Sequence, residues 1–148
     1  MKMEMKKILL SIVLLVLILS YGCAKKDLTD SIDITQKSWV LNKIIVDGEK
    51  FKANDFDCFN NEAYILYFEN DSVFELNTSI NVAGGVFYIQ NRGTIEISDY
   101  HEYTEAGGHH NEIDENLLNK MLTVNSYKVI GEDLYLEGDD IEIVFSEK

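Results

Sequence analysis

The chain has 148 residues and a formal net charge of −13, from 13 lysines and arginines against 26 aspartates and glutamates. A surface with this charge repels the phosphates of nucleic acids and the headgroups of anionic lipids. It therefore excludes nucleic acids as partners, and also a membrane attachment through a basic patch. The length allows one globular domain with an apolar core and a short extension.

Residues 1–22 have the three parts of a secretion signal peptide. Lys2, Lys6 and Lys7 form a basic start, and residues 8–19 are apolar apart from one serine. This run is shorter than the roughly 20 apolar residues that a membrane-spanning helix needs, and it is typical of a signal-peptide core. An uncleaved N-terminal anchor is the alternative interpretation.

Residues 19–23, Leu-Ser-Tyr-Gly-Cys, resemble the lipobox of bacterial lipoproteins, although Tyr21 is larger than the usual residue at that place. The resemblance implies cleavage after Gly22, a diacylglycerol on the sulfur of Cys23, and usually a third acyl chain, such as palmitate, on its amine. Several acyl chains hold a protein stably on a membrane, whereas one alone binds weakly. The implied location is the bacterial cell envelope, and Ala24 after the cysteine favours the outer membrane.

The domain boundaries follow from composition. Residues 23–35 are polar and aperiodic and predict a tether, with the folded domain over residues 36–148. Because Cys23 is expected to carry lipid, Cys58 has no partner in the chain for a disulfide. Cys58 is therefore expected to be a small buried residue, and a reactive or intermolecular thiol is the alternative.

From residue 38 onward, short apolar segments separated by turn residues predict antiparallel β structure. The first five segments are 38–46, 63–69, 72–76, 86–90 and 94–98. In the first of them, Trp39, Leu41 and Ile45 are expected to face the core. Asp47-Gly48 after it is a typical hairpin turn, because glycine accepts positive φ angles.

The apolar period changes to that of a helix near residue 113. The apolar stripe consists of Ile113, Leu117, Leu118, Met121 and Leu122. Asn111 is expected to cap the helix, whose first turn is acidic and so favourable for the helix dipole. Three strands, 126–130, 134–137 and 141–146, then close the chain, with Ile141, Ile143 and Phe145 pointing inward.

These segments predict a mainly β fold made of five strands, one helix and three strands. Eight antiparallel strands can close into a barrel, which removes exposed strand edges. The inserted helix is expected to plug the barrel or to cover its side. We therefore predict a small antiparallel eight-stranded β-barrel with one inserted helix.

Several parts of the chain together resemble the META domain of bacterial envelope and heat-shock lipoproteins. They are the strand sequences Trp39-Val40-Leu41 and Gly85-Val86-Phe87-Tyr88, and the helix, strand, glycine turn and Leu-x-Leu strand of residues 112–136. The Gly-Cys-Asn motif that this family often has is absent from residues 81–85. The N-terminal half also resembles lipocalin-like bacterial lipoproteins. Both resemblances imply a small β-barrel without a catalytic motif, and the META resemblance implies a role in envelope stress.

Residues 99–112 contain all three histidines of the chain and are expected to form a polar loop. The candidate metal ligands are His101, His109, His110 and Glu112, because imidazole and carboxylate groups suit zinc, nickel or copper. Adjacent histidines rarely bind one metal together, so a solvated loop without a metal is the favoured interpretation, and a pH-sensitive contact is a third one. No cofactor is predicted.

Nine aromatic residues are candidates for the interior of the barrel. They are Trp39, Tyr64, Tyr67, Phe68, Phe74, Phe87, Tyr88, Tyr127 and Phe145. Eight strands enclose just enough space to be filled by side chains or to hold one small ligand. A packed core is favoured because the helix is also available as a plug, and a calyx for a hydrophobic ligand is the alternative.

The sequence contains no nucleophile elbow, no phosphate-binding loop and no dinucleotide fingerprint. We therefore predict a non-catalytic binding module, monomeric and held on the membrane by its N-terminal lipid. Its partner is expected to be another envelope protein, contacted through the barrel rim or through residues 99–112. The alternatives are a carrier of small hydrophobic ligands and a metal-handling protein that uses the segment from His101 to Glu112.

Overall fold

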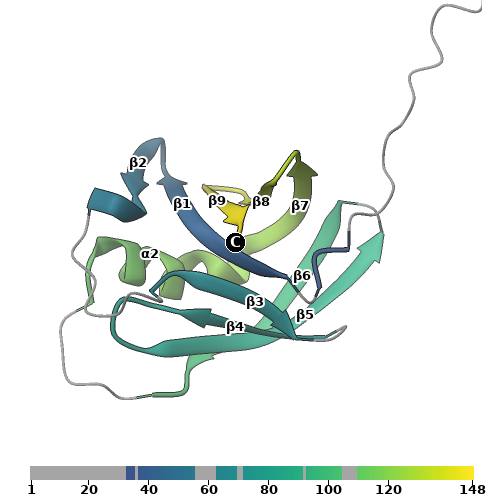
Figure 1. Ribbon diagram of the computed structural model, residues 1–148, viewed down its shortest axis with the longest axis horizontal. Helices are drawn as coiled ribbons and strands as arrows, with labels where there is room; N and C mark the ends of the chain where they lie inside the picture. Colours follow the sequence, from purple (N-terminus) through teal and green to yellow (C-terminus); the bar gives the residue numbers. More distant parts are fainter. Residues whose placement is uncertain (1–32, 36, 56–62, 70–71, 92, 105–109) are drawn as a thin grey trace, which may run out of the picture. The chain divides into compact units, whose positions relative to one another are not determined.

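The computed structural model describes residues 33–35, 37–55, 63–69, 72–91, 93–104 and 110–148. The predicted signal peptide, Cys23, Cys58 and His109 lie outside the described residues. The elements are β1 (Ser38–Val46), β2 (Glu49–Lys52), η1 (Ala53–Asp55), β3 (Ile65–Glu69), β4 (Val73–Asn77), β5 (Val82–Asn91), β6 (Thr94–Glu102), α2 (Glu112–Lys120), η2 (Met121–Thr123), β7 (Val124–Ile130), β8 (Asp133–Gly138) and β9 (Ile141–Glu147) (Figure 1). No helix in this part of the chain is long and apolar enough to cross a membrane.

The strands form a closed antiparallel barrel, as the sequence predicts. Eight strands pair in the order β1, β3, β4, β5, β6, β7, β8 and β9, and β9 pairs with β1 to close the ring. In Figure 1, β3, β4 and β5 lie side by side along one wall, and β7, β8, β9 and β1 form the other. Five barrel strands precede the helix and three follow it, so the predicted order is confirmed.

The strand β2 is an addition to the predicted barrel. It pairs with the second half of β1, whereas the first half of β1 pairs with β3. The turn between β1 and β2 is Asp47-Gly48, with φ angles of 51° and 85°, as a type I′ hairpin requires. The sequence of β2 has only Phe51 as an apolar residue, so it shows no alternation that would reveal a strand.

A bulge in β1 changes which residues face the core. The register between β1 and β9 shifts between Leu41 and Lys43. Trp39 and Leu41 are buried, as predicted, but Ile44 is buried next and Ile45 is not. The prediction for Ile45 is wrong because one extra residue in a strand reverses the alternation beyond it.

Apolar side chains pack the barrel interior. The largest fully buried ones are Trp39, Phe68, Phe74, Phe87 and Phe145. The Phe68 ring lies 4.8 Å from that of Phe87 and 6.1 Å from that of Phe74, measured between ring centroids. The inward positions predicted for β9 are confirmed, since Ile141, Ile143 and Phe145 are all buried.

The packed part of the chain reaches into the segment predicted as a tether. Ile34 is buried, and its carbonyl accepts a hydrogen bond of 3.1 Å from the indole nitrogen of Trp39. Packing of the domain therefore begins at least two residues before the predicted boundary at Gln36.

The helix α2 begins with a capping box and packs its apolar side on the barrel core. The side chain of Asn111 accepts hydrogen bonds of 3.0 Å from the backbone nitrogens of Ile113 and Asp114, which confirms the predicted N-cap. Ile113 and Leu117 are fully buried in the core. Leu122 is 52% exposed, because the chain leaves the α-helical period where η2 begins.

Candidate functional site

A second bulge, in β6, turns two polar side chains inward. The register between β5 and β6 shifts here, and Asp99 has a φ of 53°, which is uncommon for a residue other than glycine. Beyond Asp99, Tyr100 is buried and Glu102 is half-buried, whereas His101 is exposed. Bulges of this kind often re-aim side chains beside functional sites.

The expectation that residues 99–112 form one loop is wrong at its start. β6 continues through Glu102, because the bulge lets the strand keep its pairing with β5 beyond Asp99. Tyr103 and Thr104 also remain tied to the sheet. The Tyr103 nitrogen donates to the Val82 carbonyl at 2.8 Å, and the Thr104 hydroxyl accepts from the Val82 nitrogen at 2.9 Å.

The inward side chains of β6 meet polar groups at the start of α2. We call this set the buried polar cluster, and it consists of Ser79, Asn81, Tyr100, Glu102, His110 and Asp114. Its centre is Asp114, whose side chain is completely buried. The carboxylate accepts hydrogen bonds from the Ser79 nitrogen at 3.0 Å, from the Ser79 hydroxyl and from the Asn111 nitrogen at 3.3 Å. These bonds offset the cost of burying a charge.

His110 lies between two carboxylates. Its Nε2 is 3.4 Å from Oε2 of Glu102, and its Nδ1 is 3.7 Å from Oδ2 of Asp114. Glu102 also accepts a hydrogen bond of 3.2 Å from the side-chain nitrogen of Asn81. The cluster therefore links β6, α2 and the connection between β4 and β5.

Three atoms of the buried polar cluster have no hydrogen-bond partner among the described residues. They are the Tyr100 hydroxyl, Oε1 of Glu102 and Nδ1 of His110. Burial raises the pKa of Tyr100 above its ordinary value of 10.0, and the charges of Glu102 and Asp114 raise it further. Unpaired buried polar atoms reduce the free energy of unfolding. The buried polar cluster concentrates this cost at one place in an otherwise apolar interior.

The cluster does not form an activated nucleophile. The Ser79 hydroxyl donates to Asp114 and makes no contact with His110 that would let the imidazole remove its proton. A catalytic serine needs a neighbouring base that accepts this proton. The geometry therefore assigns Ser79 and Asp114 to holding the helix on the barrel.

Of the candidate metal ligands, the three that the structure describes, His101, His110 and Glu112, do not come together. His101 lies on the outside of β6, with Nδ1 2.6 Å from the carbonyl of Asp99, and Glu112 is exposed at the start of α2. His110 turns each ring nitrogen toward a different carboxylate. Among the described residues, no three histidine, cysteine, aspartate or glutamate side chains converge as metal ligands.

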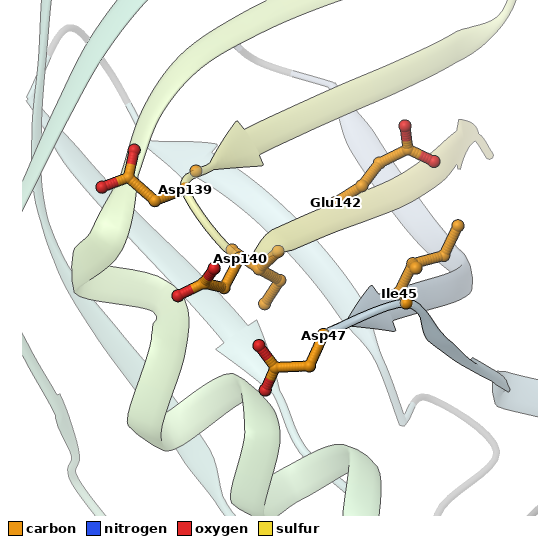
Figure 2. A pocket seen from close by; sticks show the side chains of 8 residues that line it. Ile45, Asp47, Asp139, Asp140 and Glu142 are labelled. Carbon is orange, nitrogen blue, oxygen red and sulfur yellow. The ribbon is translucent and has the colours of Figure 1, made fainter.

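An open pocket of about 360 Å³ lies where the turns β1–β2 and β8–β9 meet. The Asp47 nitrogen donates to the Asp140 carbonyl at 3.1 Å and joins the two turns. Figure 2 shows the carboxylates of Asp47 and Asp140 on the same side of the pocket, whereas Asp139 and Glu142 point away from them. Two of these acids already contact lysines, Asp140 at 3.9 Å and Glu142 at 3.2 Å.

The nine candidate aromatic residues divide between the interior and the surface. Six are buried in the core, namely Trp39, Tyr64, Phe68, Phe74, Phe87 and Phe145. Tyr127 is partly buried against them. Tyr67 and Tyr88 are 38% and 52% exposed, since they alternate with inward residues of β3 and β5. The interior aromatic positions thus form a packed core.

Comparisons with known proteins support the fold. No protein-family model matches the chain, and no curated protein matches it. Among solved structures, the chain is similar to a DUF4847 family protein from Bacteroides vulgatus ATCC 8482, with a TM-score of 0.55 and 9% identity, over 77% of this chain and 94% of that one. At this identity the likeness shows the fold alone. The antiparallel barrel implied by the lipocalin-like resemblance is therefore confirmed, and membership of the META family stays a prediction.

Proposed function

We propose that the chain is a lipid-anchored lipoprotein of the bacterial cell envelope, of META or lipocalin-like type, that binds another envelope protein and performs no catalysis. The observation that most supports a binding role is the division of its aromatic side chains. The buried rings fill the barrel, while Tyr67, Tyr88 and Tyr103 are 38%, 52% and 48% exposed outside it. Exposed aromatic residues are typical of protein contact surfaces.

A carrier of hydrophobic ligands is less well supported. Eight-stranded barrels hold a small ligand only where their interior is not filled by side chains. Here Trp39, Phe68, Phe87 and Phe145 occupy the interior and are at most 1% exposed. The open pocket at the rim is lined by four acidic residues and only two isoleucines, which suits a cation better than an apolar molecule.

The anchor is tested by Cys23→Ala in the full chain. We expect the variant to lose acyl labelling and to leave the membrane fraction, because a chain with a net charge of −13 is repelled by anionic lipid. Metabolic labelling with a palmitate analogue and cell fractionation measure both effects. Cys58→Ala is the matched control and should remain labelled and bound. Labelling that persists in Cys23→Ala would contradict the anchor.

The binding role is tested by cross-linking in the protein's own cells. A photoreactive amino acid is placed at Tyr67 or Tyr88, and as a control at Ile130, which is 58% exposed on β7. We expect a discrete cross-linked protein from positions 67 and 88. The absence of cross-links from all three positions, together with a bound small molecule in the native mass spectrum, would favour the carrier and reject the protein-binding role.

A further inference from the structure

The outer wall formed by β3 to β6 carries a continuous row of outward residues. In the registers of these strands, Tyr67 lies opposite Glu75, Glu75 lies opposite Gly84, and Gly84 lies opposite His101. Directly opposite residues in an antiparallel pair share one face of the sheet. Tyr67, Glu75 and His101 are all exposed, so this face is the outside of the barrel.

Gly84 leaves room for an aromatic ring at this row, because it has no side chain. A Cβ atom on Gly84 would lie 2.7 Å from the hydroxyl oxygen of Tyr103 and 2.9 Å from its Cε2, so a side chain there would displace the ring. The His101 ring packs edge-on against Tyr103, with 4.7 Å between centroids. The hydrogen bond from the Tyr103 nitrogen to the Val82 carbonyl fixes the backbone from which this ring extends. Tyr103 is therefore pre-positioned on the sheet while 48% of its surface remains open to solvent.

The same wall is acidic without compensation from its own strands. The strands β3 to β6 contain five aspartates and glutamates and no lysine or arginine. One of the five, Glu102, faces inward beside His110, and Arg92 in the β5–β6 turn lies outside the described residues. Glu69, Glu75 and Glu96 are exposed on the outer face. The lysines of the described chain lie elsewhere, at positions 37, 43, 50, 52, 120, 128 and 148.

We propose that this acidic aromatic face, defined by Tyr67, Tyr88, Tyr103, Glu69, Glu75 and Glu96, docks a segment rich in arginine or lysine on a partner protein. Cations bind over tyrosine rings and pair with carboxylates, and guanidinium groups do both. Charge complementarity disfavours the other occupants, because a second copy of this chain and an anionic lipid surface would both bring negative charge. The proposal rests on the proposed function and adds the surface and the chemistry of the partner.

The test uses the full lipidated chain in detergent and a short synthetic peptide rich in arginine. The control peptide carries citrulline in place of arginine, which keeps the shape and removes the charge. We expect saturable binding of the arginine peptide alone, with backbone amide shifts in the NMR spectrum that gather on β3 to β6. Tyr67→Ser, Tyr103→Ser and Glu75→Gln should each weaken binding about threefold to tenfold.

Matched variants elsewhere on the barrel separate docking from diffuse attraction. Ile130→Ser removes an exposed apolar side chain from β7, and Glu132→Gln removes one charge from the turn after it. Both should bind the peptide as the unaltered chain does. Equal weakening by these controls, amide shifts at the Asp47 and Asp140 pocket, or no binding of the arginine peptide would each overturn the proposal.

The cross-linking experiment distinguishes this inference from the proposed function. Cross-links from position 67 without any peptide binding would leave the binding role standing and refute the cationic partner. Cross-links from position 130 alone would place the partner contact on the wall that contains β7, and would refute the proposed face on β3 to β6. Loss of both readouts, together with a bound small molecule in the native mass spectrum, would reject the two proposals together.

Discussion

At the scale of single residues, two strained backbone positions determine the polar site. Asp99 and Tyr64 have φ angles of 53° and 61°, which cost energy in residues other than glycine and persist only where the surroundings compensate. Asp99 turns Tyr100 and Glu102 toward the interior. Tyr64 places its hydroxyl 2.7 Å from the side-chain nitrogen of Asn111, which donates to it at the cap of α2. Both strained residues therefore serve the joint between barrel and helix.

The buried hydroxyl of Tyr100 leads to a prediction about alkaline pH. Burial and the neighbouring carboxylates raise the pKa of Tyr100, so the native state holds its proton more tightly than the unfolded chain, which releases it near 10.0. This stabilising contribution is complete below pH 10.0 and is lost as pH rises through the higher native value. In Tyr100→Phe it is absent, so the alkaline loss of stability should be smaller than in the unaltered chain.

Urea unfolding at neutral pH and above pH 10.0 measures this difference. At neutral pH, Tyr100→Phe should stay within about 1 kcal/mol of the unaltered chain, because the hydroxyl has no partner among the described residues and the ring stays stacked on Phe74. Tyr88→Phe on the exposed face controls for the loss of a tyrosine. Identical alkaline behaviour of Tyr100→Phe and the unaltered chain would disprove the role given to this hydroxyl.

At the scale of elements, α2 is held to the barrel by polar contacts as well as by its apolar side. Asp114 accepts from Ser79 on the connection between β4 and β5 and from Asn111 at the helix cap. A buried carboxylate with several donors is costly to replace, because those donors lose their partner. The helix start is thus fixed in position while its apolar residues pack on the core.

Asp114→Asn tests this joint. The variant keeps the size of the side chain but turns an amide donor toward groups that also donate. We expect a loss of about 1–3 kcal/mol in the free energy of unfolding, measured with urea. Glu115→Gln removes one charge from the same helical turn at an exposed position and should cost far less. If both variants lost stability equally, the effect would come from the helix dipole and not from the contacts with Ser79.

Most elements were predictable from the sequence, whereas the bulges and the polar cluster were not. Alternating apolar residues and turn signals revealed the barrel strands, and the period around Ile113 revealed the helix. The bulged strands carry no glycine at Asn42 or Asp99, so the alternation predicts Ile45 in the core and a strand that ends at Ser98. Gly85 lies opposite the second bulge on β5, but glycine there also suits a turn. Ser79 and Asp114 meet only through the fold. The one local signal was Asp114 three residues after Asn111, the spacing of a capping box.

At the scale of the whole molecule, ion pairs are unevenly distributed around the barrel. The pairs Lys37–Glu147, Lys43–Glu142 and Lys128–Glu137 join residues at or near β1, β7, β8 and β9. Exposed pairs of this kind add little to stability, but they give three carboxylates of that wall a lysine partner. On the wall of β3 to β6, Glu69, Glu75 and Glu96 make no ion pair among the described residues. Their field falls off over roughly 10 Å at moderate salt. A cationic partner would therefore find carboxylates without a lysine partner beside the exposed tyrosines, and salt should slow its association more than its release.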